Sequence, residues 1–405
     1  METWDYKKYI KGDKIIWIVL IWLSAISLVI VYSSTGALAY RKNGGDTSHY
    51  FLRQLLLQGV GYIIIIGMLK FFKLSFYNKK ANLIFIGSII AVCLGLVFGR
   101  GGESTGRTLS LGILSIQPAE IAKVAIIIWI ARLLAKTQKD PRLLRIAFFK
   151  IMTGVSLICL PIMLANFSSA ALLFGTAVIM MFVGRVNVKY LGAVMLAGIG
   201  VVVLIYFTAP FLSEKLHIGR FQTIRNRIER KIHGDKDSVK GLTQDDFAMI
   251  AINRGGISGV GVGKSEISNF MPAAYNDFIY SIIIEEYGLP GGIIVLLLYI
   301  ILFTRGGIII GKCRHTFPMF LATGAVTLIL LQALINMAVS SGVIVTGQPL
   351  PWISWGGSSQ ILTAVTFGLL LSVSYETDQE SQPASETNLS SNEALQGEDV
   401  LMTKN

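Results

Sequence analysis

Residues 255–292 read GGISGVGVGKSEISNFMPAAYNDFIYSIIIEEYGLPGG, a glycine-rich loop followed by an apolar run that contains acids. Asp277 stands at the beginning of the apolar run, and Glu285 and Glu286 stand within it. An acidic side chain in or at the mouth of a membrane segment is costly and marks a functional site by default. We therefore expect a membrane protein in which the rest of the chain builds a cavity around Asp277.

The composition of the whole chain supports a membrane protein. Of its 405 residues, 53% are hydrophobic and only 15% are charged, whereas soluble domains carry about 25% charged residues. The net charge of +12 is spread over the loops between apolar segments. This distribution is typical of cytoplasmic loops, and it lacks the single basic face that nucleic acid binding would need. The three cysteines have no metal-ligand spacing, so we expect them to be packing residues.

The apolar segments predict an all-α, polytopic membrane fold. A membrane helix needs about 20 apolar residues. About ten segments meet this requirement, at residues 15–34, 54–72, 82–99, 118–136, 146–164, 169–184, 189–209, 278–303, 316–339 and 358–375. Residues 1–375 are thus expected to form one transmembrane domain with a long loop at about 210–277. Residues 376–405, rich in Ser, Glu, Gln and Asn, are expected to form a disordered cytoplasmic tail.

Basic residues gather at alternate ends of these segments. One set of ends carries Lys7, Lys8, Lys11, Lys14, Lys70, Lys73, Lys79, Lys80, Arg132, Lys136, Lys139, Arg142, Arg145, Lys150, Arg185, Lys189, Arg305, Lys312 and Arg314. The opposite short loops carry only Arg41, Lys42, Arg53, Arg100 and Arg107. Since cytoplasmic loops are the positive ones, we expect both termini in the cytoplasm and the loop at 210–277 outside the membrane.

Two features of the long loop invite a phosphate-binding interpretation. Residues 217–231 form a basic, helix-like stretch, which is either a solvated or interfacial helix or a docking surface for anionic headgroups or a pyrophosphate. The run from Gly259 to Ser265 ends in Gly-Lys-Ser, but a phosphate loop needs a glycine where this chain has Ser258. The glycines instead favour tight turns and close approach of the backbone to a ligand.

Asp277 has two interpretations on sequence grounds. It stands where a helix begins, so it is either an N-cap that binds free backbone N–H groups or a catalytic base. Glu285, deeper in the same helix, needs a partner if it is buried. Lys123, in the fourth apolar segment, is the expected partner of Glu285 in a structural ion pair. Glu120, three residues before Lys123, is the competing partner.

Two further motifs interrupt apolar sequence. Gln117 to Lys123 reads QPAEIAK, with the proline at a helix start, where its missing N–H does no harm. Residues 346–359 read TGQPLPWISWGGSS and follow Asn336. Irregular backbone at membrane depth is tolerated only where it lines a cavity or is buried by protein. Trp352 and Trp355 are either part of such a cavity or anchors at the membrane interface.

These three motifs, in this order, resemble the SEDS family (shape, elongation, division and sporulation), which includes FtsW, RodA and SpoVE. The resemblance runs from the first apolar segment to the tenth. It implies a peptidoglycan glycosyltransferase that polymerises lipid II on the outer face of the bacterial cytoplasmic membrane. The family's essential aspartate falls on Asp277, which would act as general base on the acceptor sugar hydroxyl while undecaprenyl pyrophosphate departs.

The resemblance also implies partners and further site residues. The expected partners are lipid II, undecaprenyl pyrophosphate-linked glycan, a class B penicillin-binding protein transpeptidase and other divisome proteins. No cofactor is certain, and a divalent cation (Mg or Mn) is a candidate. The expected substrate-binding residues are Arg107, Gln117, Glu120, Lys123, Asn276, Gly347, Pro349, Ser354, Gly356, Gly357 and Ser358. They flank Asp277 or belong to the other two motifs, apart from Arg107.

The chain departs from the family pattern at Thr108, where a tryptophan is common, and at Asn166, where an acid is common. The Arg-Ile-Glu-Arg run at 227–230 is closest to division-type FtsW proteins, which favours a role in cell division at the division site, with a role in elongation as the alternative. Two other functions compete with the polymerase. A lipid II flippase should place charges along a path across both leaflets, and a non-catalytic scaffold for the transpeptidase would not need Asp277.

Overall fold

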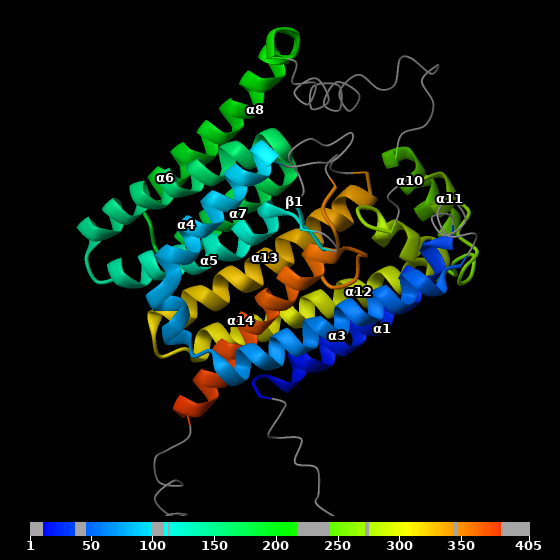
Figure 1. The fold of residues 1–405 in the computed structure, drawn as a ribbon, viewed down its shortest axis with the longest axis horizontal. Coiled ribbons are helices and arrows are strands. Elements are labelled where there is room, and N and C mark those ends of the chain that lie inside the picture. Colours follow the sequence, from blue (N-terminus) through cyan, green and yellow to red (C-terminus); the bar gives the residue numbers. More distant parts are fainter. Residues whose placement is uncertain are drawn as a thin grey trace, which may run out of the picture.

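The computed structural model describes residues 11–36, 46–98, 109–111, 114–216, 244–271, 275–342 and 347–381. Within these ranges the chain is a bundle of long helices with one short hairpin (Figure 1). The helices are α1 (Lys14–Ser34), α3 (Ser48–Phe71), α4 (Leu74–Phe98), α5 (Pro118–Thr137), α6 (Pro141–Ala165), α7 (Phe167–Val183), α8 (Val188–Leu216), α10 (Gln244–Gly255), α11 (Ile267–Phe270), α12 (Ile279–Lys312), α13 (Thr316–Ser340) and α14 (Gly357–Ser381). Strands β1 (Leu109–Leu111) and β2 (Leu114–Ile116) pair antiparallel just before α5.

The described helices confirm the all-α membrane fold. Eight of them are long and apolar enough to cross a membrane, and α7 is an apolar helix of 17 residues. Helix α5 has 20 residues but carries both Glu120 and Lys123 among its charges. Each of the ten predicted segments coincides with one of these helices.

Several predicted boundaries were wrong, because helices continue past their apolar stretch into polar sequence. Helix α12 runs to Lys312 and α8 runs to Leu216. The long loop therefore begins later than residue 210, and it contains α10 and α11. Helix α14 runs to Ser381, so residues 376–381 are helical and do not belong to a disordered tail. The basic stretch at 217–231 and the rest of the predicted tail lie outside the described residues.

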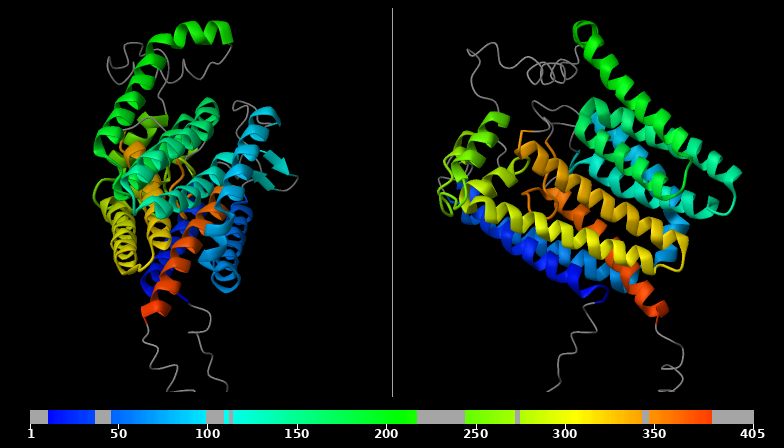
Figure 2. Two further views of the ribbon diagram at one scale, coloured as in Figure 1. Left: turned by 90° about the vertical axis from the view of Figure 1, so that its left-hand side faces the viewer. Right: turned by 180° about the vertical axis from the view of Figure 1, so that it is seen from behind.

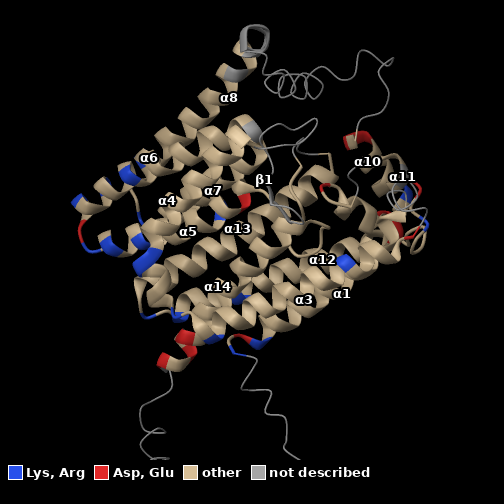
Figure 3. Ribbon diagram, viewed as in Figure 1, with Lys and Arg blue, Asp and Glu red and all other residues tan. Residues whose placement is uncertain are grey.

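Both ends of the helical domain lie at one end of the bundle. The Asp13 carboxylate caps α1 by accepting from the backbone N–H groups of Ile15 and Ile16, and it also binds the Arg305 guanidinium of α12. The Lys11 ammonium lies 4.7 Å from the ring centroid of Tyr375 in α14. Many of the basic residues gather at this end, away from the turn that leads into α12 (Figure 3). This segregation supports the sidedness expected from the loop charges.

Helices α5 and α13 lie in the interior, whereas α8 leans away from the bundle (Figure 2). The packing between α5 and α13 depends on Gly324, since a Cβ there would meet the Ile127 side chain and would lie 2.9 Å from Met180 Cε. Small residues let membrane helices approach closely in this way. By contrast, a Cβ at Gly307 in α12 would meet nothing within 4 Å.

We expect Gly324→Ala to destabilise the protein by about 1–3 kcal/mol, the usual cost of overpacking a core. Gly307→Ala is the matched control, a glycine-to-alanine change in a helix facing open space, and should be neutral or mildly stabilising. Thermal unfolding of the detergent-solubilised protein measures both. Equal effects of the two substitutions would contradict the close packing at Gly324.

Candidate active site

Asp277 lies in a turn that directly precedes α12. The N-cap of α12 is Phe278, with no side-chain cap, so the interpretation of Asp277 as the N-cap residue is wrong. The backbone carbonyl of Asp277 accepts a hydrogen bond of 2.9 Å from Asn336 Nδ2 of α13. A Cβ at Gly347 would clash with the Asp277 carboxylate. Gly347 is therefore a glycine because its backbone lies directly against the proposed base.

The irregular segment at 347–355 is held against the Asp277 turn by hydrogen bonds. Ser354 Oγ accepts from the backbone N–H of Leu350 at 2.7 Å and donates to the carbonyl of Asn276 at 2.7 Å. The backbone N–H of Trp355 donates to the carbonyl of Tyr275 at 3.1 Å. These bonds join the segment to the turn and satisfy backbone groups, as irregular backbone buried by protein requires.

The surroundings of Trp352 decide between its two interpretations, a residue of the buried segment or an anchor at the membrane interface. Trp352 is only 1% exposed, and its indole N–H donates to Ser24 Oγ at 2.7 Å. It is a core residue and not an interface anchor. The Trp355 ring packs edge-on against Tyr275, with 5.2 Å between centroids, and the Arg53 guanidinium of α3 lies 5.3 Å from the same ring.

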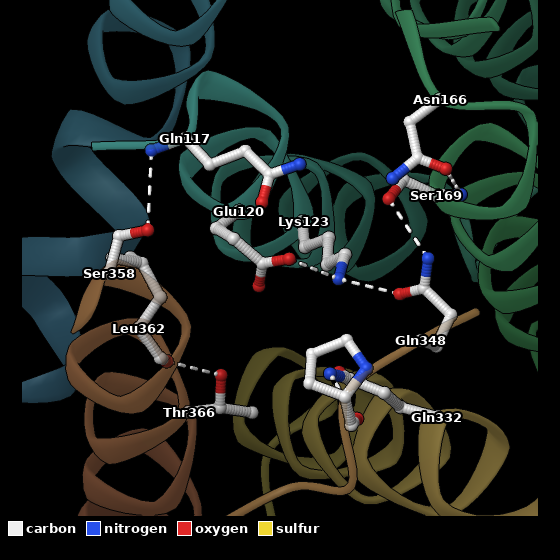
Figure 4. Close-up of polar contacts among 11 residues, drawn as sticks. Gln117, Glu120, Lys123, Asn166, Ser169, Gln332, Gln348, Ser358, Leu362 and Thr366 are labelled. Carbon is white, nitrogen blue, oxygen red and sulfur yellow. Dashed lines mark hydrogen bonds and ion pairs between the residues drawn. The ribbon is translucent and has the colours of Figure 1, made fainter. Parts of the chain in front are cut away.

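Lys123 belongs to a buried polar chain that joins α5, the 347–355 segment and α7 (Figure 4). Its Nζ lies 2.6 Å from Glu120 Oε1 and donates to Gln348 Oε1 at 3.2 Å. Gln348 Nε2 in turn donates to Ser169 Oγ at 3.1 Å. These four side chains are almost fully buried. Each charge therefore needs the partners it has, because an unpaired buried charge is strongly destabilising.

The predicted ion pair between Lys123 and Glu285 is wrong. Glu285 Oε2 accepts a hydrogen bond of 2.5 Å from Ser265 Oγ, and its other oxygen lies 4.0 Å from the Arg254 guanidinium. The spacing of three residues places Glu120 on the same face of α5 as Lys123, so it reaches Lys123 without any tertiary contact. Glu286, which has no predicted role, accepts a hydrogen bond of 2.7 Å from Ser33 Oγ of α1.

The backbone of the glycine-rich loop forms hydrogen bonds with α12 where that helix is interrupted. Gly288 has a φ of 67°, which interrupts the helix. The carbonyl groups of Glu285 and Glu286 instead accept from the backbone N–H groups of Val260 and Gly261, at 2.9 and 3.1 Å. A Cβ at Gly259 would clash with the carbonyl of Glu286. The close backbone approach expected of these glycines is thus seen at Gly259, where the backbone that it approaches is that of α12.

The remaining expected site residues fall into three groups. Gln117 and Ser358 meet where α5 and α14 begin, with the backbone N–H of Gln117 donating to Ser358 Oγ at 3.3 Å. Gly356 and Gly357 lie at the same helix start, and the Pro349 carbonyl accepts from Gln332 at 3.1 Å. Arg107 and Thr108 lie outside the described residues.

Asn166 is a helix cap in this chain. It is the N-cap of α7, and its Oδ1 accepts from the backbone N–H of Ser169 at 3.3 Å. The residue that replaces the family's usual acid therefore orients a member of the buried polar chain.

Electrostatic effects outside the membrane helices favour charged Glu266 and neutral Tyr275. The Arg254 guanidinium lies 2.5 Å from Glu266 and holds the pKa of that carboxyl below its usual value. Burial raises the pKa of the Tyr275 phenol, with a further contribution from Asp277.

Among the described residues, no cluster of three His, Cys, Asp or Glu side chains is placed to hold a metal ion.

Sequence reasoning did not select Asn336 or Gln348 as site residues, although both are central. Asn336 Nδ2 donates to the carbonyl of Gln348 at 2.7 Å as well as to that of Asp277. Gln348 thus connects the Lys123 chain to the Asp277 turn. The available signal was a polar residue between glycine and proline in apolar surroundings, together with a buried asparagine in an apolar helix.

We expect Lys123→Met and Glu120→Gln to be coupled by more than about 1 kcal/mol in unfolding free energy, since the two side chains form a buried ion pair. Lys123→Met and Glu285→Gln should instead be additive within about 0.5 kcal/mol, because they share no partner. Equilibrium unfolding of the single and double variants measures both cycles. Coupling of Lys123 to Glu285 alone would reinstate the pairing that the structure excludes.

Comparison with known proteins agrees with the site. Residues 13–379 match the family described as "Cell cycle protein" (FTSW_RODA_SPOVE). A probable peptidoglycan glycosyltransferase FtsW of Geobacter metallireducens is 31% identical over 383 residues, covering 91% of this chain and 96% of its own. Stage V sporulation protein E of Bacillus subtilis is 30% identical over 370 residues, covering 89% of this chain and 96% of its own.

Solved structures share the fold. One, from work on the structural coordination of polymerization and crosslinking by a peptidoglycan synthase complex, has a TM-score of 0.69 at 21% identity. It covers 90% of this chain and 98% of its own. The rod shape determining protein RodA of Thermus thermophilus has a TM-score of 0.66 at 19% identity, covering 93% and 100%. Because the family match spans nearly all of its helices and all three motifs, the chain belongs to the FtsW/RodA/SpoVE family of cell cycle proteins.

Proposed function

We propose that the chain is a peptidoglycan glycosyltransferase that polymerises lipid II into glycan strands. The observation that carries the proposal is the placement of Asp277. Its turn is fixed by hydrogen bonds from Asn336 and Ser354, and its carboxylate lies against the bare backbone of Gly347. A carboxylate held in this way suits a base that must meet one hydroxyl group in one orientation.

The proposed reaction is a glycosyl transfer that inverts the anomeric centre. The Asp277 carboxylate takes the proton from the acceptor sugar hydroxyl, and the resulting nucleophile attacks the anomeric carbon of the lipid-linked donor. The bond to undecaprenyl pyrophosphate breaks as the glycosidic bond forms. Attack from the face opposite the leaving group inverts the anomeric centre.

The departing pyrophosphate needs positive groups to stabilise its charge. Lys123 is buried and already paired with Glu120, so its main role is to hold the 347–355 segment. Arg53 is the better candidate, because it is exposed and lies over Trp355, whose backbone binds the Asp277 turn. Arg107 is the second candidate from the sequence.

The orientation in the membrane follows from the charges. With the basic end of the bundle in the cytoplasm, Asp277 lies at the outer face, where the lipid-linked substrate would be used. The termini are then cytoplasmic and α10 and α11 are extracytoplasmic. The similarity to a chain from a peptidoglycan synthase complex supports a class B penicillin-binding protein as the transpeptidase partner. The relatives named FtsW support action at the division site with other divisome proteins.

We expect Asp277→Ala and Asp277→Asn to lower the initial rate of polymerisation by about 100-fold or more, the usual contribution of a general base. The measurement is glycan polymer formed from purified lipid II by the protein with its transpeptidase partner. Asp246→Asn, which removes an acid from α10, is the matched control and should retain activity.

Three outcomes separate the competing functions. Loss of polymer by Asp277→Ala while the transpeptidase still co-purifies excludes the scaffold. Polymer formation by the wild-type protein in detergent, where there is no second leaflet to reach, excludes a flippase as its only activity. Wild-type polymerisation by Asp277→Ala would refute the catalytic assignment.

We expect Asn336→Ala to lower kcat by about tenfold or more, because it frees the Asp277 turn from α13. Gln332→Ala is the matched control. It lies one turn earlier on α13 and binds the same irregular segment at Pro349 without contacting Asp277. If Asn336 only stabilises the fold, the two variants will lose the same fraction of activity, in step with their loss of thermal stability.

A further inference from the structure

A cavity of about 410 Å³ lies at the basic end of the bundle, between the turn that joins α3 to α4 and the end of α14. Three lysines from two parts of the chain line it: Lys11 just before α1, and Lys70 and Lys73 at the end of α3 and in the turn that follows. The Asp277 turn is at the opposite end of the bundle, so this cavity is separate from the candidate active site.

The charges around the cavity favour an anion. Among the residues that the structure describes, Lys11, Lys70 and Lys73 form no ion pair. Glu376 is the one acid among the described residues of the lining, and its carboxylate accepts from the backbone N–H of Leu74 at 3.4 Å. Ser75 adds a hydroxyl group that can donate to an oxygen of the ligand.

Apolar side chains also line the cavity. Phe72, in the turn, exposes 43% of its surface, and Phe71, the last residue of α3 beside it, exposes 72%. Leu69 and Leu74 contribute to the lining. Exposed phenylalanine rings at the end of a membrane helix offer apolar surface to acyl chains, and the lysines beside them offer positive charge to a headgroup. The occupant should therefore carry both an anionic group and hydrocarbon chains.

We propose that this cavity binds the phosphate headgroup of an anionic phospholipid from the leaflet at the basic end, with its acyl chains along the exposed Phe71 and Phe72. Basic pockets between membrane helices on the cytoplasmic side are suited to such headgroups. The bound lipid ties the turn between α3 and α4 to α14. The proposal rests on the membrane-spanning fold and not on the catalytic role of Asp277.

The test uses the full chain in nanodiscs of phosphatidylcholine that contain increasing fractions of phosphatidylglycerol. The shift in thermal unfolding temperature reports binding, and native mass spectrometry counts the retained lipid. Lys70→Gln with Lys73→Gln should weaken the apparent affinity by about thirtyfold, from about 1 kcal/mol for each lysine.

The control is Lys79→Gln with Lys80→Gln. These exposed lysines lie on α4 at the same end, outside the cavity lining, and their loss changes the net charge equally. The control should bind phosphatidylglycerol as the wild type does. Equal loss in both double variants would show a general charge effect and overturn the site, as would no loss in either. An equal shift from inorganic phosphate in pure phosphatidylcholine would identify a soluble anion as the occupant and overturn the lipid assignment.

Discussion

Irregular backbone inside a membrane protein carries N–H and C=O groups that lipid cannot satisfy, and each unsatisfied group costs several kcal/mol. The segment at 347–355 is such a backbone, and the side chains around it supply the missing hydrogen bonds. Asn336 donates to two carbonyls at once, one in the segment and one at Asp277. The position of the proposed base is thus a consequence of how the buried backbone is satisfied.

The same requirement governs the other interruption of the bundle. Helix α12 breaks at Gly288, and the backbone of the glycine-rich loop takes up the carbonyls that the break leaves free. A buried charge needs partners just as a buried backbone group does. Lys123 has two, because it forms an ion pair with Glu120 and donates a hydrogen bond to Gln348. The bonds made at the two breaks in regular structure, together with the buried ion pair, therefore stabilise the end of the bundle that contains Asp277.

The sequence predicted the helices well, because the length of an apolar run is set by the membrane that it must cross. It was wrong where polar residues continue a helix, as at Leu216 and Ser381, and it gave no indication of the β1–β2 hairpin. Acids and irregular sequence in apolar surroundings pointed to Asp277 and the three motifs, and the family resemblance then implied the catalytic role of Asp277. The sequence missed the role of Gln348, because that role depends on Lys123, Ser169 and Asn336 meeting in space. It favoured Glu285 over Glu120 as the partner of Lys123, and no local pattern distinguishes a tertiary pair from a pair on one helix.

We expect the buried polar chain through Gln348 to hold the Asp277 turn in its working position. Gln348→Met breaks this chain at its centre, because methionine keeps the volume but loses the side-chain bonds to Lys123 and Ser169. The measurement is the initial rate of lipid II polymerisation by the variant in complex with its transpeptidase, at a temperature where unfolding shows it to be intact. We expect the rate to be lowered by about tenfold or more, with Asp277 still present. Polymerisation at the wild-type rate by the intact variant would show that the chain through Gln348 does not position the base.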